Sequence, residues 1–118
     1  MKISFKKLSQ SFKNAFQGLK AVTKEHSFYL MLLITLLILL LAFFLKISFS
    51  EWLVLTLLIG LVLSLEIFNT ALEKLLDFLQ PNHSEKVKII KDLVAAAVLI
   101  ISLVSVVIGL FIFLPKIF

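Results

Sequence analysis

The run FYLMLLITLLILLLAFFL, residues 28–45, decides the fold class of this chain, because polar groups hardly interrupt it. A helix needs about 17–25 predominantly apolar residues to cross the hydrocarbon layer of a bilayer, and this run reaches that length. A second run begins near Trp52, a residue type that favours the membrane interface, and its helical periodicity continues through polar residues to about residue 79. A third run covers residues 93–114 and is followed by Pro115, which we expect to end the helix. We therefore predict an all-α membrane protein with spans at about 28–45, 52–79 and 93–114.

The composition supports the same class. The chain has 118 residues, 61% of them hydrophobic, and a mean hydropathy of +1.13, whereas an ordinary soluble domain is about half apolar. This length leaves room for one domain, residues 1–118. The absence of cysteine excludes disulfides and thiolate metal sites. The net charge of +5 comes from lysine alone, and in so apolar a chain it indicates anionic lipid headgroups or phosphates rather than nucleic acid as partners.

Residues 3–20 carry phenylalanine and leucine at three- and four-residue spacing, with lysine on other faces. This pattern is typical of an amphipathic helix that lies in the plane of the membrane surface; a solvated helix packed on a partner is the alternative. Lysines are concentrated before the first span and in the connection 74–92. Because positive charge favours the cytoplasmic side, we expect a multi-pass protein of the bacterial inner membrane with a cytoplasmic N-terminus and the C-terminus outside.

The segment EIFNTALEKLLD, residues 66–77, carries the polar groups of the second span. They recur at i, i+3, i+4, i+7 and i+11, and so share one helical face: Glu66, Asn69, Thr70, Glu73 and Asp77. A carboxylate costs roughly 2.5–3.5 kcal/mol at the bilayer centre and less toward the interface, a cost usually kept for function. Lys74 points to another face of this helix and is not expected to offset Glu66. For Asn69 and Thr70 alone, hydrogen bonding between helices is an equally good explanation.

Acidic residues also stand at the cytoplasmic ends of the other two spans, at Glu25 and at Lys91-Asp92. All three spans therefore present acids at one level of the membrane. Glu25 and Glu73 offer the hard oxygen ligands that suit Mg²⁺, which takes one or two carboxylates together with substrate phosphates. Glu66 lies deeper, where a general base could reach a lipid hydroxyl. The arrangement favours phosphoryl transfer, although the scattered glycines allow neither a Walker loop nor a kinase Gly-rich loop.

These residues resemble the prokaryotic diacylglycerol kinase family of small membrane lipid kinases, which includes undecaprenol kinases. The likeness rests on E-x-x-N-T-A-x-E-x-x-x-D at 66–77, on Lys91-Asp92 followed by small residues, and on Gly18 and Glu25 at the family's spacing. It implies a homotrimer whose active sites form between subunits, with ATP as co-substrate and Mg²⁺ as cofactor. The substrate it implies is a membrane lipid alcohol, undecaprenol or diacylglycerol. The sequence Asn69-Thr70-Ala71 looks more like the undecaprenol kinases.

The resemblance also implies a role for each matching residue. Glu66 would be the catalytic base, and Glu25 and Glu73 would hold Mg²⁺. The nucleotide would contact these two ligands and a further set of polar side chains, namely Lys7, Asn69, Asp77, His83, Lys91 and Asp92. The lipid would be bound by Glu66, Thr70 and Ala95. Lys7 stands where the family usually has arginine, and lysine lacks the bidentate fork of a guanidinium group.

Two other functions fit part of the pattern. In a small oligomeric transporter, Glu66 would bind protons or cations, as membrane carboxylates do. A transport carboxylate is expected near the middle of the membrane with polar groups toward both faces, whereas here every acid except Glu51 lies on the predicted cytoplasmic side. A purely structural role in the membrane is the third possibility, but it does not explain why the acids are aligned on one helical face.

Overall fold

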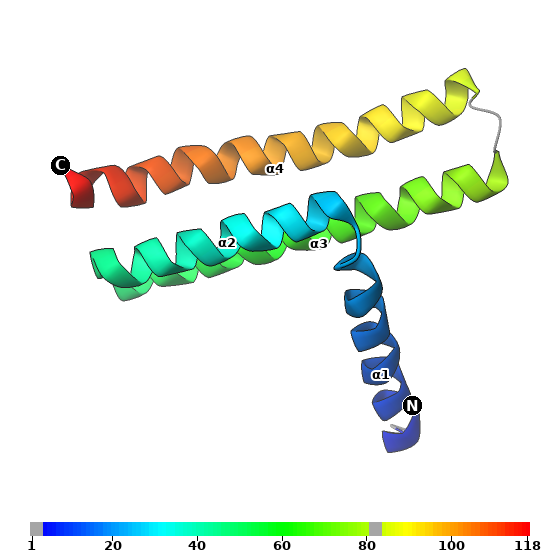
Figure 1. The fold of residues 1–118 in the computed structure, drawn as a ribbon, viewed down its shortest axis with the longest axis horizontal. Coiled ribbons are helices and arrows are strands. Elements are labelled where there is room, and N and C mark those ends of the chain that lie inside the picture. The colour runs from blue at the N-terminus through cyan, green and yellow to red at the C-terminus, as the bar shows by residue number, and fades with distance from the viewer. Residues whose placement is uncertain (1–3, 81–83) are drawn as a thin grey trace.

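The computed structural model describes residues 4–80 and 84–118 (Figure 1). Within these ranges the chain forms the helices α1 (Phe5–Val22), α2 (His26–Leu45), α3 (Phe49–Leu79) and α4 (Glu85–Ile117), and no strand. The helices α2, α3 and α4 are long and apolar enough to cross a membrane. The prediction of an all-α chain with three spans is therefore confirmed. The helix predicted at 3–20 is present as α1, and its place in the membrane surface stays a prediction.

The fourth helix is longer than the third predicted span, which it contains. α4 begins at Glu85, well before the apolar run at 93–114, and it continues through Pro115 to Ile117. The prediction that Pro115 ends the helix is wrong. Proline lacks the amide hydrogen that would bond to the carbonyl of Phe111. So close to the end of α4, this loss affects only the last turn of the helix.

The connection between α3 and α4 falls at Gln80-Pro81-Asn82-His83, a stretch whose residue types predict the end of a helix. The amide of Gln80 bonds to the carbonyl of Leu76 at 2.9 Å and closes α3, while residues 81–83 lie outside the described ranges. Ser84 caps α4, because its hydroxyl accepts a hydrogen bond from the amide of Val87 at 3.3 Å. Ser84 follows the breaking residues and is a favoured type at the start of a helix, so the sequence itself predicts this cap.

The helices differ in length, and this difference positions the polar segment. At about 1.5 Å per residue, the 20 residues of α2 extend about 30 Å, which matches the hydrocarbon thickness of a bilayer. The 31 residues of α3 and the 33 of α4 extend about 46 and 50 Å. α3 and α4 run antiparallel past the start of α2, where α1 leaves the bundle at a steep angle (Figure 1). The polar segment 66–77 of α3 therefore lies at and beyond the first turns of α2.

The buried core lies toward the opposite end, at the turn between α2 and α3. Ala42, Ile47, Leu55 and Ile112 form one cluster there. Ile47 reaches the cluster because Lys46 adopts a left-handed conformation, with φ of 53°, and the amide of Ile47 bonds back to the carbonyl of Ala42 at 3.5 Å. Many other large apolar side chains of α2, α3 and α4 are exposed. An apolar surface of this extent is expected to meet lipid or other protein.

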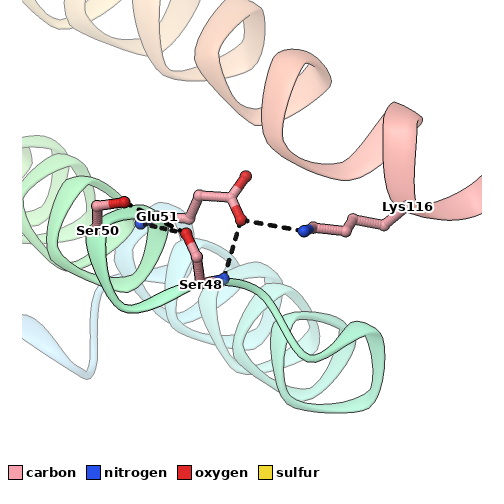
Figure 2. Close-up of polar contacts among 4 residues, drawn as sticks. All are labelled: Ser48, Ser50, Glu51 and Lys116. Atoms are coloured by element: carbon pink, nitrogen blue, oxygen red, sulfur yellow. Dashed lines mark hydrogen bonds and ion pairs between the residues drawn. The ribbon is translucent and has the colours of Figure 1, made fainter.

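At this end of the bundle, an ion pair between Glu51 and Lys116 connects the start of α3 to the end of α4 (Figure 2). The carboxylate of Glu51 accepts a hydrogen bond from the amide of Ser48 at 2.9 Å and lies 3.3 Å from Nζ of Lys116. The hydroxyl of Ser48 in turn accepts from the amide of Glu51, which completes a capping box at the start of α3. The carboxylate of Glu51 therefore caps the start of α3 and also contacts the last turn of α4.

We predict that Glu51→Gln lowers the unfolding temperature of the purified protein in detergent, by roughly a few degrees. The amide keeps the capping geometry, so the loss comes from the charge shared with Lys116. Lys116→Gln is expected to cause a similar loss, and the double variant little more, because the two changes remove the same interaction. Fully additive losses in the thermal melts would show that the two side chains do not stabilise each other.

Candidate functional site

Glu66 is a buried carboxylate, 8% exposed, in the part of α3 that lies beside the first turn of α2. Its Oε1 accepts a hydrogen bond from the hydroxyl of Ser27 at 3.4 Å. This distance is long for a hydroxyl donor, so the bond offsets little of the free energy of removing a carboxylate from water. Sequence reasoning missed Ser27, since nothing in the spacing of α2 marks it as a partner of α3. The carboxylate of Glu66 is therefore buried between α2 and α3, and its hydrogen bond with Ser27 is weak.

The next turn of α3 carries the two polar residues for which bonding between helices was the alternative. The hydroxyl of Thr70 donates to the carbonyl of Glu66 at 3.0 Å, so this bond lies within α3. Oδ1 of Asn69 is buried and has no hydrogen-bond partner in the described part of the chain. An unsatisfied buried acceptor costs about 1–3 kcal/mol. Asn69 is therefore a candidate for contact with a bound ligand.

Glu25 precedes α2 and forms an ion pair with Lys74 of α3, with 2.8 Å between Oε1 and Nζ. Lys74 lies off the acidic face of α3, as expected, and its partner comes from the junction of α1 and α2. The two side chains border a groove of about 640 Å³ between α1 and α3, whose walls include Gly18, Leu19, Ile67, Thr70 and Ala71. The groove is mostly apolar and has a charged edge, which suits an amphiphilic molecule.

The predicted residues of α4 lie at the far end of α3. Nζ of Lys91 is 2.7 Å from Oδ1 of Asp77 and so connects α4 to the last turns of α3. Asp92 pairs with Lys88 within α4 at 2.9 Å. Together, Lys88, Lys91 and Asp92 line a hollow of about 480 Å³ at the start of α4. The structure thus brings Asp77 and Lys91 together, whereas Asp92 bonds along its own helix.

The remaining predicted residues are not brought together. Glu73, Ala95 and Lys7 are exposed on α3, α4 and α1 respectively, and His83 lies outside the described residues. Among the residues that the structure describes, no group of three or more histidine, cysteine or acidic side chains gathers as a metal site. The magnesium site at Glu25 and Glu73 therefore stays a prediction.

The geometry thus combines a buried carboxylate, an unsatisfied amide oxygen and a groove with a charged edge. The family described as prokaryotic diacylglycerol kinase matches residues 13–113 of the sequence. The chain belongs to the prokaryotic diacylglycerol kinase family. A curated relative, undecaprenol kinase of Bacillus subtilis (strain 168), is 36% identical over 108 residues, which cover 91% of this chain and 88% of the relative. No solved structure matches the chain.

Membership of the diacylglycerol kinase family confirms the resemblance seen in the sequence and identifies the chain as a lipid kinase of the bacterial membrane. A kinase takes ATP as co-substrate, and a lipid kinase acts on a lipid. The matched range includes every candidate site residue except Lys7. The match does not by itself assign roles to the individual residues.

We predict that Asn69→Leu stabilises this diacylglycerol kinase family member by about 1–3 kcal/mol, because it removes a buried acceptor that lacks a partner. Unfolding in detergent, followed by circular dichroism, measures the change. Thr70→Val is the matched control, since its hydroxyl already bonds within α3 and its removal is not expected to stabilise. A less stable Asn69→Leu protein would show that Oδ1 has a partner in the assembled enzyme.

Proposed function

We propose that this kinase transfers the γ-phosphate of ATP to the hydroxyl of a membrane lipid, with Glu66 as the general base. The buried carboxylate of Glu66 carries the proposal. It lies where α3 passes from its apolar run into its polar segment, and in this proposal that point is at the level of the lipid headgroups. Glu66 takes the proton of the lipid hydroxyl, the alcohol oxygen attacks the γ-phosphorus, and the bond to the leaving ADP oxygen breaks.

Glu25 and Glu73 are proposed as the carboxylates that hold Mg²⁺ together with the phosphates of ATP. Mg²⁺ usually takes one or two carboxylates and completes its shell with phosphates and water, so two acids are a sufficient protein contribution. The chemistry of the donors supports the fit, because carboxylate oxygens are the hard ligands that Mg²⁺ takes, although in this structure Glu25 is paired with the Lys74 ammonium at 2.8 Å. When bound, Mg²⁺ supplies positive charge that stabilises the phosphates during transfer.

The other predicted residues bind and orient the two substrates in this proposal. The unsatisfied Oδ1 of Asn69 supports a nucleotide contact at the turn next to Glu66. Thr70 lines the groove between α1 and α3, which supports a lipid contact there. The remaining proposed nucleotide contacts are Lys7, Asp77, His83, Lys91 and Asp92, and Ala95 is the further lipid contact.

Residues 1–118 act as a single kinase domain in this proposal. α1 lies in the cytoplasmic surface of the inner membrane, and α2, α3 and α4 cross the bilayer. The exposed phenylalanines of α1 support that placement, with Phe5 83%, Phe12 60% and Phe16 67% exposed. The protein assembles as a homotrimer in this proposal, and the extensive apolar surface of the other helices meets lipid and the neighbouring subunits.

Undecaprenol is the proposed lipid, ahead of diacylglycerol. The curated relative, named as an undecaprenol kinase, is similar along almost the whole chain. Both lipids present a primary alcohol at the same boundary, so the proposed base serves either. Phosphorylation of either lipid would feed lipid-carrier or phospholipid metabolism.

Glu66→Gln is expected to reduce lipid phosphorylation by about 10²–10⁴-fold, because the amide cannot accept the proton of the alcohol. Circular dichroism of the purified variant checks that the helices remain. Glu51→Gln, which changes an acid at the opposite end of the bundle, is the matched control and is expected to keep the wild-type rate at temperatures well below its unfolding. A wild-type rate in Glu66→Gln would remove the proposed base.

A side-by-side assay with radiolabelled ATP tests the choice of lipid. Purified enzyme in mixed micelles is given undecaprenol or diacylglycerol at equal mole fraction, and we expect the higher kcat/KM with undecaprenol. A higher value for diacylglycerol would reverse the substrate assignment and leave the kinase chemistry in place. Proton flux in vesicles without ATP turnover would instead favour the transporter.

A further inference from the structure

The proposed metal ligand Glu25 is already neutralised by a cation of the chain itself. Nζ of Lys74 lies 2.8 Å from Oε1 of Glu25, a distance typical of a charge-assisted hydrogen bond. The side chain of Glu25 is 39% exposed and that of Lys74 68% exposed. Both border the groove between α1 and α3. The ion pair is therefore accessible to solutes and does not belong to the packed interior.

The position of Lys74 relates it to one of the two proposed metal ligands. It contacts Glu25 across the junction with α2, whereas Glu73, its neighbour along α3, lies on another face of the helix. A divalent cation held by Glu25 would lie within a few ångströms of the Lys74 ammonium unless that side chain moved away. Two cations at such a distance repel each other, and both require the same carboxylate oxygens.

We propose that Lys74 is a built-in counter-ion of the metal site, which competes with the divalent cation for Glu25 and so sets the affinity of the site. The inference rests on the proposed function, in which Glu25 holds Mg²⁺. Without metal, Lys74 keeps the carboxylate of Glu25 neutralised at the edge of the groove. When the metal binds, the flexible lysine side chain is displaced into solvent. Exposed ion pairs are weak, so the metal can break this one readily.

A purely structural ion pair is the alternative, in which Lys74 only ties the α1–α2 junction to α3. The two explanations differ in what happens when the charge of Lys74 is removed. A structural tie predicts a less ordered Glu25 and equal or weaker metal binding. Competition predicts tighter metal binding, because the carboxylate is left without its internal cation.

Direct titration with Mn²⁺ separates these outcomes without relying on activity. Mn²⁺ stands in for Mg²⁺, and electron paramagnetic resonance of the free ion gives its affinity for the full-length protein in detergent micelles. Each titration is run with the non-hydrolysable ATP analogue AMP-PNP, whose phosphates complete the proposed site, and the binding of Mn²⁺ to AMP-PNP alone is subtracted. Lys74→Met is expected to bind Mn²⁺ roughly two- to fivefold more tightly than the wild type, which is the size of effect for an exposed ion pair. Lys74→Arg keeps the cation and is expected to stay near the wild-type affinity.

Lys86→Met is the matched control, since it removes an exposed lysine near the start of α4, and it is expected to leave Mn²⁺ affinity unchanged. Lys74→Gln provides a second test if the methionine variant does not fold. Equal or weaker Mn²⁺ binding in the folded Lys74 variants would overturn the inference.

Glu25→Gln distinguishes a failure of this inference from a failure of the proposed metal site. If Glu25→Gln weakens Mn²⁺ binding while Lys74→Met leaves it unchanged, the metal role of Glu25 stands and the competition is refuted. If Glu25→Gln keeps wild-type Mn²⁺ affinity, Glu25 is not a metal ligand, and both the metal site and the competition are refuted. Weakening in Glu25→Gln together with tightening in Lys74→Met is the result we expect.

Discussion

The burial of one carboxylate, that of Glu66, constrains the rest of this structure. A buried carboxylate with a single weak hydrogen bond is unfavourable, and backbone groups of a candidate membrane span must be bonded within their own helix. α3 meets both requirements by continuing as one helix from its apolar run into its polar segment. Its backbone stays bonded while its side chains change from lipid-facing to polar. The first turn of α2 then covers Glu66 and supplies the hydroxyl of Ser27.

The two ends of the bundle have different physical roles. Near the α2–α3 turn, the buried cluster around Ala42 and the ion pair of Glu51 with Lys116 hold three helices together. At the other end, α3 and α4 extend past α2 and carry exposed charges, a groove and the unsatisfied oxygen of Asn69. In the proposed function these groups bind ligands, which explains why they are not all satisfied within the chain, at a cost in stability.

Hydropathy and helical spacing predict a large part of this arrangement. The apolar runs give the three spans, and the i, i+3, i+4 pattern alone places Glu66 and Asn69 on one face of a helix. The contacts of Ser27 and Lys74 could not be predicted in this way, because each joins two helices whose relative stagger is set by packing. The extension of α4 through Pro115 was missed for another reason. Sequence rules treat proline as a helix breaker, and only the position of a proline within the last turn shows that the missing bond matters little.

The placement of Glu25 shows how an exposed side chain can still be held in position. Glu25 lies in the short link between α1 and α2, and its amide bonds to the carbonyl of Val22 at 3.0 Å. Val22, at the end of α1, is 6% exposed, and Phe28, in the first turn of α2, is 2% exposed. Packing on both sides fixes the backbone at Glu25, while its carboxylate reaches the groove and Lys74. Because α1 ends at Val22, the packing that holds the end of α1 also holds the backbone of Glu25 beside the groove, even though most of α1 lies apart from the bundle.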